Sequence, residues 1–372
     1  MSTAAEPKLR IGIVSPYSLT VPGGVQAQVL GLARELRRVG HEARVLGPCD
    51  GPPPESFVTP LGNSLPLAAN GSIAPLAPDP PASLRTLRVL RDEGFDVIHL
   101  HEPLVPGPAM TALVVHTAPT VATFHAAGTS ASYRLLKSAL SRMIDRIDCK
   151  VVVSKDALAL AQSHLGGEYE VLFNGVEIDQ IRAVDPVARP EGSTRPIVFF
   201  CGRHEDRKGL HVLVDAVIGC DLDVTVWVGS DGPDTAALME RTAGDERFEW
   251  LGRISDTDKF ARLQTADVFC APSLGGESCG VVLIEAMAAG TTVVASSLDG
   301  YRNVATDGED AILVPPGDPD ALCGGLRRAL SGSEEVERLR RAGLARAETF
   351  AMSRLAEEYL RIYREVVVHS SP

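Results

Sequence analysis

Two glutamates, Glu277 and Glu285, lie eight positions apart within residues 271–290. The apolar run Asp267–Ala271 predicts a strand, a Gly-Gly loop follows it, and the next apolar residues recur at helical spacing. Glu277 is therefore expected just before a helix and Glu285 about two turns on. Because open α/β sheets bind ligands at the carboxyl ends of their strands, and carboxylates bind hydroxyl groups strongly, the pair is a candidate site for a sugar and a ribose. The alternative is an ordinary strand–loop–helix with two solvated glutamates.

The start of this helix is a second candidate, because free backbone N–H groups can bind a phosphate there. The residues concerned are Ser278, Cys279, Gly280 and Val281. A glycine pair, Gly23 and Gly24, stands in the first strand-to-helix turn, where backbone can approach a ligand closely. Simple turn chemistry is the alternative. This turn lacks the G-x-G-x-x-G pattern, which argues against a nicotinamide dehydrogenase.

Three cations, Arg203, Arg207 and Lys208, stand in the loop between a predicted strand and the next helix. Breaking a sugar–phosphate bond builds negative charge on the leaving diphosphate, and fixed cations stabilise that charge by about 3 kcal/mol each. Two such cations would make a metal ion unnecessary, so no essential metal or other cofactor is expected. Solvated surface charges beside the neighbouring acids are the alternative.

A histidine, His125, ends the predicted strand Thr120–His125 at the same kind of sheet edge. It could hydrogen-bond a sugar and orient the reacting centre, or act as a general base, or be purely structural. His99 and His101 share one strand face, but no third ligand or acidic cluster is suggested elsewhere. A metal site is therefore not expected.

Predicted strands and helices alternate along the whole chain, which is typical of parallel sheets covered on both faces. Strands are expected at Leu9–Ser15, Ala43–Leu46, Asp96–His101, Thr120–His125, Cys149–Ser154, Tyr169–Phe173, Ile197–Cys201, Val224–Val228, Phe248–Leu251, Asp267–Ala271, Thr292–Ala295 and Ala311–Val314. Residues 50–82 are rich in Pro and Gly and predict mostly loop, followed by a short helix, Leu84–Arg91.

The segment 185–196 carries three prolines and no apolar periodicity, which predicts a linker. The expected organisation is a first Rossmann-like domain, 1–184, this linker, a second Rossmann-like domain, 197–351, and a final segment, 352–372. The helix of that last segment is long enough to cross back to the first domain.

The composition bounds the class of protein. The chain has 372 residues, 45% of them hydrophobic and 23% charged, which is typical of about two globular domains. Its net charge of −12 argues against a general nucleic-acid binder. The seven cysteines are dispersed and form no C-x-x-C pair. Cys149, Cys201 and Cys270 lie in or beside apolar runs, which predicts small core residues in a reducing compartment. Without a signal-peptide pattern or a run of about 18 apolar residues, a cytoplasmic protein is expected.

The motif at 277–285, together with the other segments above, resembles that of the family-four retaining glycosyltransferases with the GT-B fold. The resemblance covers about residues 9–366 and implies two facing Rossmann-like domains, the first on the acceptor side and the second binding the nucleotide-sugar donor. It implies that Glu277 meets the donor sugar and Glu285 the nucleotide ribose. The catalytic set implied is His125, Glu277, Arg203 and Lys208. The donor site implied also includes Gly23, Gly24, Arg207, Gly229, Ile254, Asp256, Lys259 and the helix start 278–281.

Within the family, the chain resembles the actinobacterial phosphatidyl-myo-inositol α-mannosyltransferases, through stretches such as 15–18, 21–26, 99–103 and 174–176. This resemblance implies GDP-mannose as donor and an inositol lipid as acceptor at the inner face of the cell membrane. It places Tyr17, Gln26 and Asn70 on the inositol side.

The chain departs from this subgroup on the acceptor side. Pro75 and Ser130 stand where the subgroup carries cations, and the three arginines of helix Leu84–Arg91 are followed by Asp92 and Glu93. Lost cations weaken contact with a lipid phosphate and an anionic membrane. A UDP-sugar enzyme with a soluble acceptor, a nucleotide-sugar epimerase and a nucleotide-binding module without catalysis therefore remain alternatives.

Overall fold

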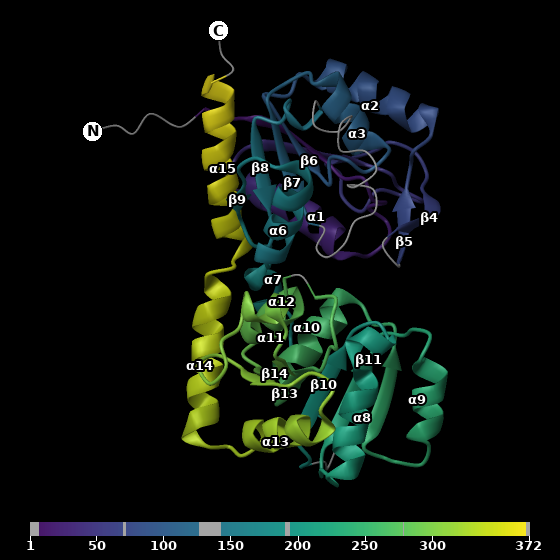
Figure 1. The fold of residues 1–372 in the computed structure, drawn as a ribbon, viewed down its shortest axis with the longest axis vertical. Coiled ribbons are helices and arrows are strands. Elements are labelled where there is room, and N and C mark those ends of the chain that lie inside the picture. The colour runs from purple at the N-terminus through teal and green to yellow at the C-terminus, as the bar shows by residue number, and fades with distance from the viewer. Residues whose placement is uncertain (1–6, 70–71, 126–142, 190–193, 278, 370–372) are drawn as a thin grey trace, which may run out of the picture. The chain divides into compact units, whose positions relative to one another are not determined.

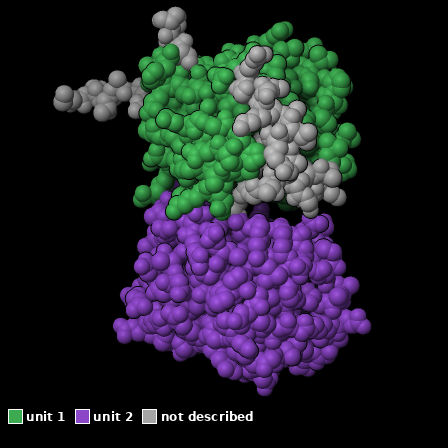
Figure 2. Space-filling model, viewed as in Figure 1, with its two compact units in different colours: residues 1–175, 352–372 green, residues 176–351 purple. Residues whose placement is uncertain are grey.

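The computed structural model describes residues 7–69, 72–125, 143–189, 194–277 and 279–369. These residues belong to two compact units, coloured separately in Figure 2. Unit 1 comprises residues 1–175 and 352–372, and unit 2 comprises residues 176–351. Among the described helices, none combines the length and the apolar character needed to cross a membrane.

Unit 1 is built on a seven-stranded parallel sheet in the order β3-β2-β1-β6-β7-β8-β9. Strands β6, β7, β8 and β9 are labelled in Figure 1. Its strands are β1 (Arg10–Val14), β2 (Glu42–Gly47), β3 (Val58–Pro60), β6 (Val97–His101), β7 (Thr120–Phe124), β8 (Cys149–Val152) and β9 (Glu170–Val171). Its helices are α1 (Gly24–Arg38), α2 (Pro80–Glu93), α3 (Pro108–Val115), α6 (Lys155–Leu165) and α15 (Met352–His369).

Both faces of this sheet are buried, as the near-continuous apolar strands require. Ile11 and Ile13 of β1 pack with α1 and α15, whereas Val14 belongs to the opposite cluster with α3 and α6. α15, close to the C-terminus of the chain, belongs to unit 1. The buried hydroxyl groups of Tyr359 and Tyr363 on α15 bind Thr123 and His99 of the sheet.

The prediction of mostly loop for residues 50–82 missed three short strands. The structure places β3 there, together with an antiparallel hairpin of β4 (Leu65–Ala69) and β5 (Ser72–Leu76). Pro60, Pro66 and Pro75 lie inside these short strands and mask the strand pattern, because proline is disfavoured in sheets except at edges. The residue pattern also predicts a helix over 132–146, and most of that range lies outside the described residues.

Unit 2 contains a six-stranded parallel sheet in the order β12-β11-β10-β13-β14-β15. The strands are β10 (Ile197–Cys201), β11 (Thr225–Gly229), β12 (Phe248–Gly252), β13 (Val268–Ala271), β14 (Thr292–Ser296) and β15 (Ile312–Val314). The helices are α7 (Ile178–Arg182), α8 (Leu210–Gly219), α9 (Thr235–Arg241), α10 (Asp256–Thr265), α11 (Val281–Ala288), α12 (Asp299–Arg302), α13 (Pro319–Ala329) and α14 (Glu334–Glu348), with a 3₁₀ turn at Asp206–Lys208.

The sheet order of unit 2 creates a switch point between β10 and β13, from which the chain builds outwards in both directions. The unit begins at Val176, ahead of the proline-bearing segment 185–196. Gln264 of α10 holds the segment before residue 185 in unit 2. Its side-chain amide donates to the carbonyl oxygens of Ile181 at 2.7 Å and Val184 at 2.6 Å.

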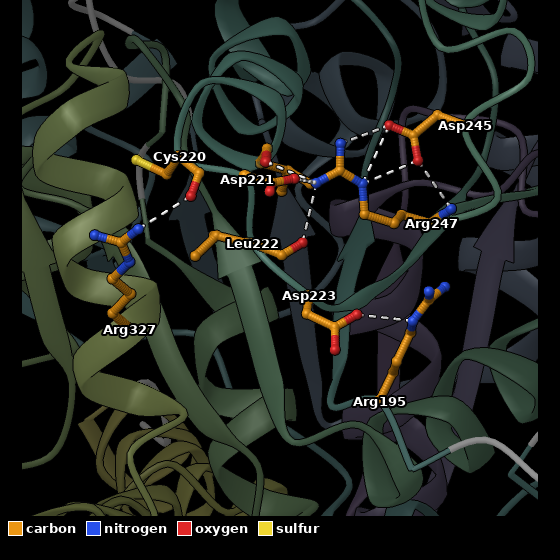
Figure 3. Close-up of polar contacts among 9 residues, drawn as sticks. Arg195, Cys220, Asp221, Leu222, Asp223, Asp245, Arg247 and Arg327 are labelled. Atoms are coloured by element: carbon orange, nitrogen blue, oxygen red, sulfur yellow. Dashed lines mark hydrogen bonds and ion pairs between the residues drawn. The ribbon is translucent and has the colours of Figure 1, made fainter.

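The amino ends of β11 and β12 are tied together by Arg247 (Figure 3). Its guanidinium donates to both carboxylate oxygens of Asp245 and to the carbonyl of Leu222, and this pairing lowers the pKa of the Asp245 carboxyl. Nearby, Arg327 donates to the carbonyl of Cys220 at 3.0 Å. This edge of the sheet is the one opposite the carboxyl ends of the strands.

Two of the cysteines form a disulfide, which the sequence pattern did not predict. Cys220, at the end of α8, forms a disulfide with Cys323 of α13 across 103 positions of sequence. Only the packing of α8 against α13 brings the two together, and no local spacing signals it. The remaining cysteines are not part of a disulfide: Cys49, Cys149, Cys201, Cys270 and Cys279.

Candidate active site

The loops that follow β10 and β13 lie against each other at the switch point of unit 2. The backbone N–H of Leu274 donates to the carbonyl of Arg207 at 2.8 Å. Gly209 has a φ of +67°, and a Cβ there would lie 2.0 Å from the carbonyl oxygen of Pro272. Only glycine fits where the two loops approach each other so closely. This approach brings the cations of the loop after β10 to the glutamate of the loop after β13.

Lys208 and Glu277 form the centre of this arrangement. The Lys208 Nζ lies 2.6 Å from Glu277 Oε1, and the side chains are 21% and 11% exposed. Ser273 donates to the same oxygen at 3.0 Å, and the hydroxyl of buried Tyr301 lies 2.9 Å from Ser273 Oγ. Among the described residues, these contacts all fall on Oε1, so Oε2 is left for a ligand hydroxyl.

The Tyr301 phenol is buried and stays protonated. Burial raises its pKa well above the usual range, and the charge of Glu277 adds to the effect. Because the Ser273 hydroxyl proton is given to Glu277, the Tyr301 hydroxyl must donate to Ser273. Tyr301, Ser273 and Glu277 thus form a directed chain of hydrogen bonds that orients the carboxylate.

The other two predicted cations are less enclosed. Arg207 forms an ion pair with Glu205 at 2.6 Å and donates a hydrogen bond to the Gly276 carbonyl at 3.3 Å. Its guanidinium also lies 3.9 Å from Glu277 Oε1. Arg203 is the most exposed of the three, at 59%, and its ion pair is with Glu205. The structure therefore brings Lys208 and Arg207 to Glu277 and leaves Arg203 at the rim.

A second acid–lysine pair lies between α10 and α11. Lys259 Nζ is 2.9 Å from Glu285 Oε1 and 3.1 Å from Asp256. Burial alone would lower the pKa of Lys259, but the charges of Glu285 and Asp256 outweigh it and raise that pKa above its usual value. The predicted donor residues Asp256, Lys259 and Glu285 are thus brought together.

The turn after β11 packs against the loop that carries Ile254. A Cβ on Gly229 would lie 3.0 Å from Ile254 Cδ1, so the small residue permits this contact. His204, which was not predicted as a site residue, bonds Thr235 at 2.8 Å and the Gly229 carbonyl at 3.3 Å. Burial lowers the pKa of His204, which therefore holds this turn as a neutral ring. The sequence signal that could have identified His204 is its position directly after Arg203, a predicted site residue.

The start of α11 follows directly after the loop that carries Glu277. Gly280 is the residue before the helix and has a φ of +61°, and a Cβ there would lie 2.9 Å from Val304. Val281 begins the helix and Cys279 is buried. Ser278 lies outside the described residues.

In unit 1, the predicted residue His125 directly follows β7. Its Nε2 lies 2.8 Å from His101 Nδ1, and its backbone N–H donates to Glu102 Oε1 at 2.6 Å. Glu102 is buried and has a φ of +47°, a conformation that costs energy in a non-glycine residue. Burial lowers the pKa of His125 to about 4.

His99 has a different setting from the other two histidines. Its two ring nitrogens contact Tyr363 and Thr123, each at 2.7 Å, and burial lowers its pKa to about 3. Its Nδ1 therefore links β6 to α15, and its Nε2 links β6 to the neighbouring strand β7. His99 is a structural link rather than a ligand.

The predicted acceptor residues lie around the start of α1. The Gln26 side chain is buried and donates to the Ser18 carbonyl at 3.3 Å, and a Cβ on Gly23 would lie 2.4 Å from Gln26 Oε1. Around Gly24, by contrast, a Cβ would meet no described atom within 4 Å. Burial raises the pKa of Tyr17, and the charge of Glu102 adds to this effect. Asn70 lies outside the described residues.

Two units with parallel sheets, and acid–lysine pairs at the switch point of the second, are the architecture of the GT-B glycosyltransferases. Solved structures support this class. A glycosyltransferase from Rickettsia africae has a TM-score of 0.76 at 18% identity, covering 98% of this chain and 100% of that one. Sucrose-phosphate synthase from Thermosynechococcus elongatus has a TM-score of 0.74 at 20% identity, with coverages of 98% and 100%.

Residues 22–180 match the model "Glycosyltransferase Family 4", and residues 195–332 match "Glycosyl transferases group 1". Phosphatidyl-myo-inositol mannosyltransferase of Mycobacterium leprae is 38% identical over 98% of this chain and 98% of that protein. The protein of the same name from Propionibacterium freudenreichii is 34% identical over 95% and 94%. The chain belongs to the family-four glycosyltransferases, and it is a hexosyltransferase. The predicted family and GT-B fold are confirmed, whereas the roles of the individual site residues stay predictions.

Proposed function

We propose that the protein is a retaining mannosyltransferase that moves mannose from GDP-mannose to phosphatidylinositol or a related alcohol. The observation that carries this proposal is the 38% identity, over nearly the full length of both chains, to an enzyme named phosphatidyl-myo-inositol mannosyltransferase. The geometry at the switch point of unit 2 supports the donor half of the reaction.

Glu277 and Lys208 are assigned to the sugar and the diphosphate. The free Oε2 of Glu277 would accept a hydrogen bond from a sugar hydroxyl. A lysine ammonium has three donors, and Glu277 takes one of those of Lys208, which leaves two for phosphate oxygens. With Arg203 and Arg207 on the same loop, these charges would stabilise the leaving GDP without a metal ion.

The nucleoside is assigned to the second acid–lysine pair. Glu285, held by Lys259, would accept hydrogen bonds from the ribose, and Asp256 would hold Lys259 in place. Ile254 and the turn at Gly229 would lie beside the base. The backbone of Ser278, Cys279, Gly280 and Val281, at the positive end of α11, would meet a phosphate.

The acceptor half is assigned to unit 1, where His125 would hydrogen-bond the sugar, Gly23 and Gly24 would let backbone approach the donor, and Tyr17, Gln26 and Asn70 would meet the inositol ring. Weak peripheral contact with the inner membrane face is proposed through α2. Arg85, Arg88 and Arg91 are exposed on this helix, and Leu84 is 66% exposed.

A soluble inositol-type acceptor is the second candidate. Pro75 provides no cation. Its carbonyl accepts a hydrogen bond from the Ser18 N–H at 2.9 Å, so this position has a structural role in the backbone. Ser130, the other departure, lies outside the described residues.

The test is transfer from radiolabelled GDP-mannose or UDP-glucose, with either phosphatidylinositol vesicles or free inositol phosphate, with and without a chelator. Label from GDP-mannose should move into the lipid, resist chelation, and give an α-mannoside by NMR. Transfer to inositol phosphate alone would select the second candidate. Transfer from UDP-glucose alone, or release of a β-mannoside, would contradict the proposal.

A further inference from the structure

A column of three imidazole rings lies on the adjacent strands β6 and β7. The ring centroids of His99 and His101 are 4.4 Å apart, and those of His101 and His125 are 5.1 Å apart. His101 is the middle ring and is 2% exposed. Its Nδ1 contacts His125, but its buried Nε2 has no hydrogen-bond partner among the described residues.

We propose that His101 is a positioning residue that holds His125 in the tautomer with its proton on Nδ1. A neutral imidazole has one donor and one acceptor nitrogen, so the 2.8 Å contact between His101 Nδ1 and His125 Nε2 has two possible directions. The direction decides what the other nitrogen of each ring can do.

The unpartnered nitrogen of His101 selects between the two directions. If His125 Nε2–H donated, the proton of His101 would have to sit on its buried Nε2, as an N–H without an acceptor. If His101 Nδ1–H donates, the buried Nε2 carries only an unused lone pair. Orphaned buried N–H groups are rarer than under-satisfied acceptors, which favours the second direction.

The surroundings keep both rings neutral and in place. Burial lowers the pKa of His125 to about 4 and that of His101 well below its usual range, so near pH 7 one proton is shared in this contact. Glu102 accepts the backbone N–H of His125 at 2.6 Å, which anchors the residue that carries the ring. The second ring nitrogen of His99 is already used by Thr123, so His99 offers His101 no alternative partner there.

The consequence is a specific task for His125, which rests on its proposed contact with the sugar. With Nε2 occupied as an acceptor, its Nδ1–H is a hydrogen-bond donor to an oxygen of the bound donor substrate. His125 then orients the sugar and does not accept a proton, which decides between the two catalytic roles that the sequence left open beside a purely structural one.

The direct test is NMR of the full-length, ligand-free protein labelled with ¹⁵N-histidine. Long-range ¹H–¹⁵N correlations distinguish a protonated from a bare ring nitrogen, and the signals of His125 are those missing from His125→Asn. We expect Nδ1 protonated and Nε2 bare in His125. A protonated Nε2 in His125 would overturn the proposal. This measurement needs no substrate, so its outcome is separate from that of the proposed function.

Activity variants test the consequence. In His125→Asn the amide nitrogen can occupy the Nδ1 position, whereas in His125→Gln it falls near Nε2. We expect the Asn variant to transfer sugar at least about ten times faster than the Gln variant, as one hydrogen bond to the substrate allows. Loss of a general base would instead lower both by about a hundredfold or more.

The role of His101 is tested by His101→Asn, which keeps a donor at the Nδ1 position, against His101→Leu, which keeps only bulk. The Asn variant should retain the tautomer of His125 and most of the transfer rate, and the Leu variant should lose both. Tyr363→Phe is the matched control, because it removes a partner of His99 without touching His101. An unchanged His125 tautomer in His101→Leu would contradict the proposal.

Discussion

Lys208 Nζ and Glu277 Oε1 lie 2.6 Å apart, although the residues are 69 positions apart in sequence. The lysine therefore serves two partners in the proposed reaction, the carboxylate and the diphosphate. A charge-assisted hydrogen bond contributes about 1.5–3 kcal/mol, so Lys208→Ala should weaken GDP binding by about 10- to 150-fold.

Glu277→Gln should leave GDP affinity nearly unchanged and lower transfer by about a hundredfold, because the amide cannot replace the ionised Oε2 at the sugar. Calorimetry with GDP and a transfer assay give the two numbers. If Glu277→Gln loses GDP affinity as severely as Lys208→Ala, the assignment of Glu277 to the sugar is wrong.

How much of this site the sequence predicts can be seen in the two acid–lysine pairs. The strand–loop–helix at 267–290 follows from local apolar periodicity, so both glutamates were placed correctly relative to α11. Their lysines come from other elements, and no local rule tells which oxygen Lys208 binds. Tertiary packing decides such contacts, and it equally decides the disulfide of Cys220 and the role of His204.

The hydroxyl of Tyr301 should affect catalysis without affecting nucleotide binding. Tyr301→Phe keeps the buried ring but leaves Ser273 without its donor, so Glu277 is held less firmly. Loss of one such bond, about 1 kcal/mol, predicts a roughly fivefold lower kcat with unchanged GDP affinity.

Tyr169→Phe is the control for Tyr301→Phe, because the buried Tyr169 hydroxyl has no hydrogen-bond partner among the described residues. Steady-state kinetics of both variants and calorimetry with GDP make the comparison. Equal effects of the two substitutions would contradict the orienting role of Tyr301.

The imidazole column should make the protein acid-labile. Burial lowers the pKa of His99 to about 3 and of His125 to about 4, so below pH 6.5 the unfolded chain binds protons that the folded chain does not. Stability therefore falls as pH falls, by about 1.4 kcal/mol per pH unit for each such histidine, until the folded pKa is reached. Urea unfolding between pH 7 and pH 5 measures the slope, which His101→Asn should reduce. A flat profile would contradict burial of the neutral rings.

The disulfide between Cys220 and Cys323 should contribute stability and not activity, because it lies at α8 and α13, away from Lys208 and Glu277. It closes a long loop, so Cys323→Ser should lower the free energy of unfolding by about 2–4 kcal/mol. Thiol titration of the denatured, unreduced protein should find five free thiols. Seven thiols would show that the bond does not form, and Cys149→Ser, at a free cysteine, is the stability control.

Membrane attachment should be weak and dependent on salt. A basic residue near an anionic surface contributes about 1 kcal/mol, and three exposed arginines of α2 would give marginal binding. Asp92 and Glu93, which follow these arginines, repel an anionic membrane to different extents. Glu93 is already paired with Arg10 at 3.2 Å and Arg44 at 3.5 Å, so Asp92 carries most of the remaining repulsion. Asp92→Asn should therefore strengthen co-sedimentation with phosphatidylinositol vesicles more than Glu93→Gln does.

Arg88→Ser should weaken co-sedimentation at low salt, and physiological salt should release much of the wild-type protein, because the Debye length there is about 8 Å. Arg338→Ser on α14 of unit 2 is the matched control for the loss of one exposed arginine. Salt-resistant sedimentation that survives Arg88→Ser would contradict an electrostatic attachment through α2. It would then point to the apolar residues of that region, among which Leu84 on α2 and Leu65 on β4 are 66% and 51% exposed.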